Sequence, residues 1–423
     1  MIRVMETDFA TPLPAPELAA APTRFDERRQ ALLAAAAQRF NELGVRGATL
    51  AVIAGDVGLG TSSVTYYYRR KEDLAAACFE QAIALHDDLV GRAAGEPTLA
   101  LRVEALLVAL AHRLAEIDVG RHPQFLQFND IRALPQPHLQ RVFGLYTVWW
   151  RRVRALLSGP ETSGWTRHDR NARTHLLVSV AHWLRVWIGR HEPDDYARVA
   201  RRVAAVVLHG LNAGGQDWPD EAGHGRAWQA TAASAGQEVF LRAATELVND
   251  QGFRGASVQA IAERVKLSKG SYYHHHDTKD DLVVACFERS FALLRQALVA
   301  AEQSCGNGWQ RTCEACAALV RLQLSAQGPL LRSTATSALP TPEHRREARR
   351  TQMRLTERLA SLLVESMVDG SMRPHDPAVG AQVLAGAVNA ASELTRWVPG
   401  LEPSDAVRVY LRPAMLGLRV PAR

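Results

Sequence analysis

The sequence feature that most constrains the fold is an internal repeat. Residues 33–80 align with residues 241–288 without a gap, and roughly 20 of the paired positions are identical. The matches include three short strings: RGA at 46–48 and 254–256, IA at 53–54 and 261–262, and CFE at 78–80 and 286–288. The repeat predicts two copies of one folding unit, and the length of 423 residues also exceeds the usual size of a single domain.

The composition around the repeat predicts the domain boundaries. The first residues are rich in Pro and Ala, and the stretch AGGQDWPDEAGHG at 213–225 suits a surface connection because of its Gly, Pro and acidic residues. The expected division is a disordered tail (1–23), a first head (24–85), a first helical domain (86–212), a linker (213–227), a second head (228–293) and a second helical domain (294–423).

Each head is predicted to contain short helices. Residues 26–43 carry apolar side chains at helical spacing and end at Gly44, a typical left-handed cap. Thr49 then caps a helix over 50–57, Thr61 or Ser62 opens a third helix, and residues 71–85 form a fourth. A helix, a turn with glycine and a second short helix form a helix-turn-helix, whose second helix enters the DNA major groove.

The remainder of each copy also reads as helices, so the predicted fold class is all-α. Apolar stripes at helical spacing mark 99–114, 174–188 and 196–211 in the first copy, and helices are expected near 309–327, 342–368, 377–396 and 404–416 in the second. No alternating strand pattern competes with them.

The heads resemble the TetR family of bacterial transcriptional regulators. The shared pattern includes the spacing of the glycine, the T/S that opens the second helix, the IA pair, the aromatic triplet and the K-acidic-acidic-L string, and it fits both copies. The resemblance implies double-stranded operator DNA and a small-molecule effector as partners, and a larger helical domain whose last two helices pair as a four-helix bundle. In a fusion of two copies this pairing forms either an intramolecular pseudo-dimer or a homodimer.

The third helix of the first copy is the candidate DNA-reading element. Val64 and Tyr68 are four residues apart and are expected to pack inward, which leaves Thr65, Tyr66 and Tyr67 toward solvent. Family members usually have tyrosine where Thr65 stands, so its phosphate contact is expected to pass to Tyr66. The candidate DNA-binding residues are Thr49, Thr61, Ser62, Ser63, Thr65, Tyr66, Tyr67 and Lys71 in the first copy, and Ser257, Gln259, Lys269, Gly270, Ser271, Tyr273, His274, His275 and Lys279 in the second.

Aromatic residues of the first copy form the candidate effector pocket. They are Phe125, Phe128, Trp149, Trp183 and Trp187. A large apolar or aromatic effector and plain core packing both account for them.

The predicted function is a ligand-responsive repressor with two heads that read unlike half-sites, and two rival hypotheses stay open. Cys313 and Cys316 form a CxxC that could serve a thiol-redox-responsive regulator. Alternatively, the second head is degenerate and the protein only binds a ligand, because residues 268–281 carry three acidic and two basic side chains.

Several classes of function are not expected. Motifs of nucleotide-binding enzymes, zinc proteases and serine hydrolases are missing from the sequence, so no enzyme activity and no cofactor is predicted. The HHH string at 274–276 diverges around a helix and is not expected to hold a metal. No apolar run is long enough to span a membrane, and the net charge of +6 suits a cytoplasmic, nucleoid-associated protein.

Overall fold

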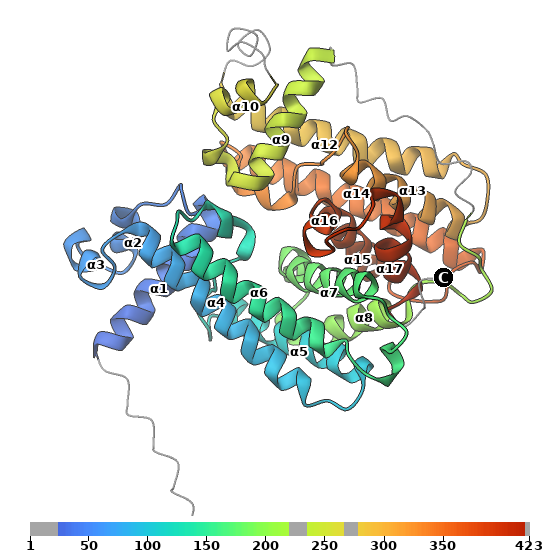
Figure 1. The fold of residues 1–423 in the computed structure, drawn as a ribbon, viewed down its shortest axis with the longest axis horizontal. Coiled ribbons are helices and arrows are strands. Elements are labelled where there is room, and N and C mark those ends of the chain that lie inside the picture. Colours follow the sequence, from blue (N-terminus) through green and yellow to red (C-terminus); the bar gives the residue numbers. More distant parts are fainter. Residues whose placement is uncertain (1–23, 220–234, 266–277, 419–423) are drawn as a thin grey trace, which may run out of the picture.

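The computed structural model describes residues 24–219, 235–265 and 278–418, and in these ranges the chain is built from helices (Figure 1). Outside the helices, a single isolated bridge between Asn212 and Met372 is the one β-type pairing of the described residues. The all-α prediction is therefore confirmed for this part of the chain. The expected tail, the linker from residue 220 onward and the third helix of the second head lie outside the described residues.

The first half of the chain forms a head and a larger helical domain. Its principal helices are α1 (Arg24–Leu43), α2 (Leu50–Asp56), α3 (Thr61–Tyr67), α4 (Lys71–Ala94), α5 (Leu99–Asp118), the 3-10 helix η1 (Phe128–Ala133), α6 (His138–Leu156), α7 (Arg167–Trp187) and α8 (Tyr196–His209). The helix α6 was not predicted, and α4 runs on past residue 85. The boundary expected between the first head and its helical domain thus falls inside a continuous helix.

The second half follows a parallel order. Its principal helices are α9 (Ala235–Gly255), α10 (Val258–Val265), α12 (Lys279–Glu302), α13 (Gly308–Leu324), the 3-10 helix η6 (Ser333–Ala338), α14 (Pro342–Val368), α15 (Pro377–Ala390), α16 (Leu394–Trp397), the π-helix η9 (Val407–Leu411) and α17 (Arg412–Leu416). As in the first half, the expected boundary at residue 293 lies within a continuous helix, α12.

In each head, the regular α-helical geometry of the first helix ends at a glycine. Gly44 has φ +72° directly after α1, and Gly252 has φ +71° inside α9, where it interrupts the helical geometry. Positive φ is strained for residues with a Cβ, so glycine is the residue that suits both turns. The turn aims the following short helix across the first one, which builds the compact head.

Equivalent side-chain contacts recur in the two halves. The buried thiol of Cys78 lies 3.6 Å from the carbonyl of Leu33, and that of Cys286 lies 3.6 Å from the carbonyl of Leu241. These contacts hold the long helix α4 or α12 against the first helix of its head.

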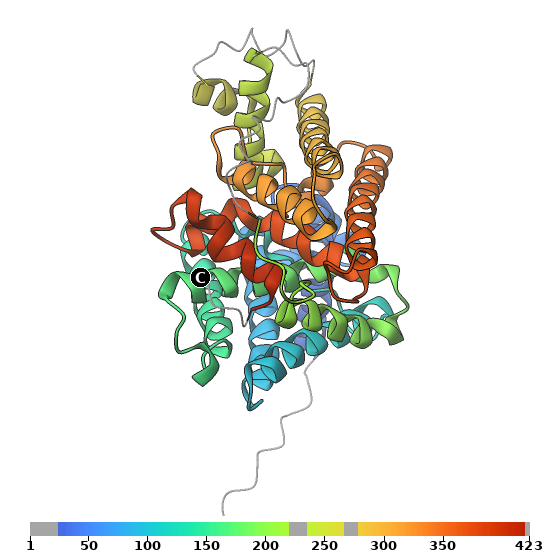
Figure 2. The same cartoon turned by 90° about the vertical axis from the view of Figure 1, so that its right-hand side faces the viewer.

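The two halves pack through their last helices in the middle of the molecule (Figures 1 and 2). Helices α7 and α8 of the first half contact α15, η9 and α17 of the second. Trp183 Nε1 donates to Gln382 Oε1 at 2.9 Å, and His175 Nε2 lies 3.0 Å from the carbonyl oxygen of Ala390. Apolar side chains fill the spaces between these polar contacts, so one continuous core joins the halves.

A glycine crossing brings the backbones of the halves together. Leu211 N donates to Met415 O at 2.7 Å, and Leu418 N donates to Val207 O at 2.9 Å. A Cβ on Gly210 would lie 2.2 Å from the carbonyl carbon of Leu416, and one on Gly417 would lie 2.6 Å from Leu208 O. Only glycine at both positions allows this close approach.

Candidate nucleic-acid interface and ligand cavity

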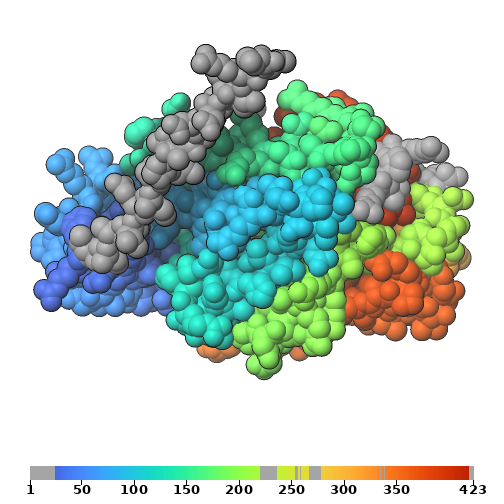
Figure 3. Space-filling view, turned by 90° about the horizontal axis from the view of Figure 1, so that it is seen from below, coloured from blue at the N-terminus to red at the C-terminus, as the bar shows by residue number. Residues whose placement is uncertain are grey.

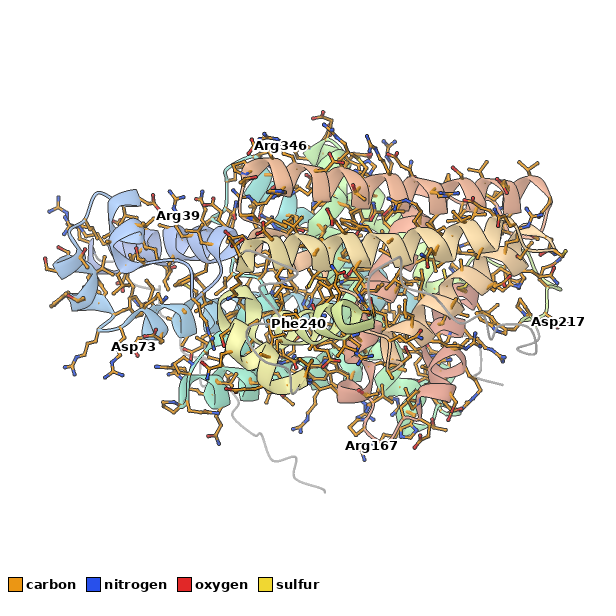
Figure 4. All side chains as sticks on the ribbon, turned by 90° about the horizontal axis from the view of Figure 1, so that it is seen from above. Arg39, Asp73, Arg167, Asp217, Phe240 and Arg346 are labelled. Carbon is orange, nitrogen blue, oxygen red and sulfur yellow. The ribbon has the colours of Figure 1, made fainter. Side chains whose placement is uncertain are left out.

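Helix α3 stands at the outer end of the first head (Figure 1), and this head projects from one end of the molecule as the blue region of Figure 3. Figure 4 shows the same head by its labelled residues Arg39 and Asp73, at the opposite end from Asp217. Val64 anchors α3 with a fully buried side chain, whereas Tyr66 is 78% exposed. A tyrosine so far from the core gains little from packing and leaves its ring and hydroxyl available to a partner.

Hydroxyl side chains surround Tyr66 on the same short helix. Thr61, Ser62, Ser63 and Thr65 are all exposed. The Thr65 hydroxyl donates to Ser62 O at 2.8 Å, which leaves its oxygen lone pairs free to accept. Such side chains at the start of a helix are suited to phosphate contacts.

Tyr67 departs in part from the prediction, and Tyr68 does not. Tyr67 is half-buried because its ring lies 4.8 Å from that of Phe25 on α1, so its expected position toward solvent holds only in part. Tyr68 follows the end of α3, is half-buried and packs against the core, as expected, and its hydroxyl accepts from Arg29 Nε at 3.1 Å. The helix ends at Tyr67, so Tyr68 takes this inward position as the C-cap of α3 and not within the helix itself.

Two other candidates of the first head have structural contacts. Thr49 is the N-cap of α2 and accepts from Val52 N at 3.3 Å. Lys71 begins α4 half-buried, and its Nζ donates to Arg46 O at 3.1 Å. Both contacts fix the helices that carry α3.

The second head has only part of its candidate surface among the described residues. Ser257 accepts from Ala260 N at 3.0 Å at the start of α10, Gln259 donates to Glu263 at 2.9 Å, and Lys279 is half-buried at the start of α12. Lys269, Gly270, Ser271, Tyr273, His274 and His275 lie outside the described residues.

An ion pair fastens the first two helices of each head, with opposite polarity. In the first head Arg39 on α1 binds Asp56 on α2, with Nε–Oδ2 and Nη2–Oδ1 distances of 2.5 and 2.6 Å. In the second head the acid is on the first helix: Arg264 on α10 binds Glu246 on α9 at 2.6 Å. The two sequences therefore provide the same connection with different residues.

A cavity of about 150 Å³ lies in the first helical domain where it meets the second half. The first half contributes a ring-rich wall that includes His86, Phe125, Phe128, Tyr146, His182 and Trp183. The second half closes the cavity with Arg332, Asn389, Glu393 and Trp397.

The five predicted pocket residues fall into three groups. Phe125, Phe128 and Trp183 line the cavity. Trp149 is buried beside it, with its ring nearly parallel to the His182 ring at 5.7 Å. Trp187 lines a neighbouring cavity of about 460 Å³, which shares Trp183 with the first and lies between α7, α12 and α14.

Two histidines in the cavity wall, the buried His86 and the half-buried His182, are held in the neutral form. Burial lowers the pKa of His86 to about 4, against a weaker opposing effect of the hydrogen bond between Nδ1 and Ala82 O at 2.8 Å. Burial also lowers the pKa of His182 to about 3, and the neighbouring His86 adds to the shift. Nε2 of His182 is buried without a hydrogen-bond partner. Sequence reasoning missed His86, because its helical spacing is that of an ordinary core residue.

The carboxylate of the cavity wall, Glu393, is surrounded by three guanidinium groups, and Nε of one of them, Arg332, is buried without a hydrogen-bond partner among the described residues. Burial by itself raises the pKa of Glu393, but Arg332, Arg132 and Arg396 outweigh it and hold that pKa well below its usual value. Arg332 Nη2 binds Glu393 Oε1 at 2.5 Å, and Arg185 lies 3.8 Å from Asp118. The cavity therefore presents no unpaired carboxylate to a ligand.

The corresponding region of the second half contains a smaller and more apolar cavity, of about 60 Å³. Its wall includes Phe287, Phe291, Leu294, Leu298, Leu319 and Leu355, together with Trp183 from the first half. Leu294 stands at the repeat position of His86, so the imidazole of one half is replaced by an aliphatic side chain in the other.

The segment around η1 connects the first cavity to both heads. Phe125 and Phe128 line the cavity, and the backbone beside them is held by Asn41 of α1, which donates to Phe125 O at 3.0 Å and accepts from Gln127 N at 2.9 Å. Asp130 accepts from Val45 N at 3.0 Å in the first head. A Cβ built on Gly252 in the second head would lie 3.5 Å from Asp130 Oδ1, so this carboxylate sits between the heads.

Burial raises the pKa of Asp130, with Val45 N–H and Arg46 opposing that effect. Sequence reasoning missed Asp130, because only the folded chain brings an acidic residue from one segment against the turns of two others.

Cys313 and Cys316 do not form a reactive thiol pair. Both side chains are about 1% exposed and lie within α13. Burial raises the pKa of Cys316 to about 12 and raises that of Cys313 well above its ordinary value. The thiolate is the reactive species, so these residues lack the property that a redox sensor requires.

The described ranges contain no cluster of three or more His, Cys, Asp or Glu side chains arranged to hold a metal. No helix of these ranges is both long and apolar enough to cross a membrane.

Comparisons with known proteins can be set beside this geometry. Residues 240–286 match the family model described as bacterial regulatory proteins, tetR family. The transposon Tn10 TetC protein of Escherichia coli is 28% identical over 80 residues, which cover 17% of this chain and 40% of that protein. This chain therefore matches less than half the length of that relative.

Solved structures of TetR regulators also resemble parts of the chain. The regulator PfmR from Thermus thermophilus is 18% identical with a TM-score of 0.34, over 41% of this chain and 95% of that chain. AibR, solved with isovaleryl coenzyme A and operator DNA, is 23% identical with a TM-score of 0.31, over 37% of this chain and 86% of that chain. The family match and the TetC relative show that part of this chain is similar to bacterial regulatory proteins of the TetR family.

Proposed function

We propose that the protein is a ligand-responsive transcriptional repressor that binds operator DNA through two unlike heads. The observation that carries the proposal is the exposed surface of α3, where Tyr66 is 78% exposed among four exposed hydroxyl side chains. In a helix-turn-helix this surface faces the major groove and the flanking phosphates. The family match at residues 240–286 supports the same role for the second head.

The chain acts as a pseudo-dimer of two tandem TetR-like copies in this proposal. Each copy supplies a head and a larger helical domain, and α7 and α8 of one pair with α15 and α17 of the other. The continuous core, the reciprocal backbone hydrogen bonds at Gly210 and Gly417, and the repeated sequence support this arrangement. Because the third-helix sequences TSSVTYY and KGSYYHH differ, the operator is expected to be asymmetric.

The effector acts through the η1 segment. A ligand in the first cavity contacts Phe125 or Phe128, and the backbone between them is bonded to Asn41 and continues to Asp130 beside both heads. A ligand that fits only one arrangement of this segment shifts the population of head positions. The spacing of the reading helices then no longer matches major grooves about 34 Å apart.

Selection of bound sequences from a random duplex library tests the proposal. The full-length chain is expected to enrich one asymmetric site, and Tyr66→Ala is expected to weaken binding to it about tenfold. Val368→Ala is the matched control, because Val368 is 82% exposed on α14, outside both heads. Enrichment of no sequence, or equal affinity of the Tyr66→Ala variant and the control, would contradict a DNA-reading role for α3.

A further inference from the structure

We propose that a cleft between the two halves binds one planar aromatic acid, whose ring stacks on Trp187 and whose carboxylate pairs with Arg349. This inter-half cleft is the cavity of about 460 Å³ that Trp187 lines between α7, α12 and α14. The site goes beyond the proposed function, because it is not the first-half cavity to which the effector is assigned and because its occupancy does not depend on DNA. Two clefts are related by the internal repeat, and the chain's own side chains fill one of them.

Trp187 and Trp397 occupy equivalent positions in the two halves. Trp187 ends α7 and opens the string WIGRHEP, and Trp397 ends α16 and opens the string WVPGLEP. Each string is followed by an arginine that binds an aspartate three positions before it, namely Arg198 with Asp195 and Arg408 with Asp405. The shared spacing and the shared ion pair show that the two tryptophans end corresponding helices.

Helices α6 and α14, which face these tryptophans, also correspond to one another. A shift of 206 positions (348 minus 142) matches buried residues of α6 with buried residues of α14. The buried pairs are Val142 with Ala348, Trp149 with Leu355, Val153 with Leu359 and Leu156 with Leu362. The same shift matches three ring side chains of α6 with three other side chains of α14: Phe143 with Arg349, Tyr146 with Gln352 and Trp150 with Thr356.

In the filled cleft, the three rings of α6 surround Trp397. The Trp150 ring stacks on the Trp397 ring at a centroid distance of 4.9 Å, and the rings of Tyr146 and Phe143 lie 5.7 and 6.2 Å from it. Aromatic rings in such arrangements attract one another beyond the gain from burial alone. The two halves therefore close this cleft with their own side chains.

In the open cleft, Trp187 faces none of these rings. Arg349, Gln352 and Thr356 line the same cleft, and among the described residues the only ring in contact with Trp187 is that of His191, edge-on at 5.9 Å. An apolar cavity of about 150 Å³ already accepts benzene, so a cleft of about 460 Å³ has room for a fused ring system and a substituent. A planar aromatic ligand can thus take the position that a ring of α6 has in the filled cleft. Because that cleft is filled, one ligand is expected per chain.

The charges of the cleft wall select the substituent of the ligand. The wall contains three charged side chains, Asp130, Arg190 and Arg349. Asp130 accepts from Val45 N–H at 3.0 Å, and Arg190 lies 3.8 Å from Glu357. The exposed side chain of Arg349 has no ion pair or hydrogen bond within the part of the chain that the structure describes. A carboxylate on the ligand can accept two parallel hydrogen bonds from this guanidinium, and two positive groups against one negative group favour an anion over a cation.

Calorimetric titration of the full-length chain in the absence of DNA tests the proposal with three probes. The first, 2-naphthoate, has both the ring and the carboxylate. The second, 2-naphthylmethylamine, has the same ring with a positive charge, and the third, cyclohexanecarboxylate, has the carboxylate without an aromatic ring. We expect one 2-naphthoate per chain and at least about tenfold weaker binding of the other two probes, the effect of losing a charge-assisted hydrogen bond or a stacking contact.

Two variants assign the site. Thr356→Trp places in the open cleft the ring that Trp150 supplies in the filled one, so it should abolish detectable binding of 2-naphthoate. Arg349→Ala removes an exposed guanidinium, so it should weaken 2-naphthoate binding about tenfold without weakening the binding of 2-naphthylmethylamine. A merely structural role of Arg349 would lower both affinities equally.

Two further variants are controls. Arg350→Ala is matched to Arg349→Ala, because Arg350 is the next exposed residue of α14 and does not line the cleft. His86→Leu changes the wall of the first-half cavity and leaves the wall of the inter-half cleft intact. Both variants should bind 2-naphthoate like the wild type.

Several results would overturn the proposal. On the wild-type chain, where no variant has to fold, they are no binding of 2-naphthoate, equal affinity for another probe, or more than one 2-naphthoate per chain. Unchanged binding in Thr356→Trp, or equal losses in Arg349→Ala and Arg350→Ala, would also contradict it. Loss of binding in His86→Leu would place the probe in the first-half cavity instead. The DNA selection contains no aromatic acid, so failure of one experiment leaves the other standing.

Discussion

The two halves share a scaffold and differ in what that scaffold encloses. Both have a glycine turn after the first head helix, a buried cysteine against that helix and an ion pair across the first two helices of the head. Yet the first half encloses a ring-rich cavity with two neutral histidines, and the second encloses a smaller, largely aliphatic one. Backbone contacts at tight turns allow few substitutions. The side chains of a cavity wall can change more freely, provided that the total side-chain volume is kept. The comparison indicates that the two halves do not enclose equivalent cavities.

The largest effect is expected where the halves are joined. Gly210→Ala introduces a Cβ 2.2 Å from backbone of the other half at a residue with φ +66°, so we expect the free energy of unfolding to fall by about 4 kcal/mol. Gly214→Ala is the matched control, because Gly214 has φ +94° but nothing within 4 Å of an added Cβ, and we expect a loss of about 1 kcal/mol. Urea denaturation measures both. Equal losses would mean that the halves do not depend on this close crossing.

The next effect separates the two cavities by pH. The unfolded chain protonates His86 below about pH 6.5, but the folded chain does so only near pH 4. The free energy of unfolding therefore has its full value above pH 6.5 and falls as the pH drops toward 4. At pH 5 the protonation of His86 in the unfolded chain lowers it by about 2 kcal/mol. His86→Leu gives the first half the residue of the second, Leu294, and should reduce the loss between pH 7.5 and pH 5. The melting temperatures of both proteins at the two pH values test this prediction. An equal drop in melting temperature for the wild type and His86→Leu would show that His86 is not the group responsible.

A smaller effect on stability is expected for the residue between the heads. Asp130→Ala removes the acceptor of Val45 N–H and should cost about 1 kcal/mol. Ala335 stands at the corresponding place in η6, so this substitution makes the two halves alike. Urea denaturation of the variant and the wild type measures this loss. Asp130→Asn keeps an oxygen acceptor and should lose less stability, and equal losses in the two variants would show that the acceptor for Val45 N–H contributes nothing.

The smallest effect is expected for the ion pairs of the heads. Exchanging Arg39 and Asp56 for one another places the acid on α1 and the base on α2. This is the arrangement of Glu246 on α9 and Arg264 on α10 in the second head. Exposed ion pairs contribute little to stability, so the exchanged variant should melt within a degree or so of the wild type. A clear drop in melting temperature would show that the polarity of each head matters to its packing.

Local sequence patterns predicted the helical class, the glycine turns and the exposure of Tyr66, because each depends on spacing within one element. They failed where a side chain's surroundings come from distant segments. Tyr67 is covered by Phe25, which precedes it by 42 positions (67 minus 25), and Asp130 is placed by turns from both heads. Helical spacing groups Trp187 with Trp183, but Trp187 lines the neighbouring cavity rather than the first, because side chains of α12 and α14 form the opposite wall there.

The stoichiometry on DNA tests the central claim most directly. Native mass spectrometry of the complex with the selected operator, combined with a footprint of both strands, counts chains and half-sites together. The account predicts one chain on one asymmetric site with two unlike half-sites. Two chains on a perfect palindrome would contradict it.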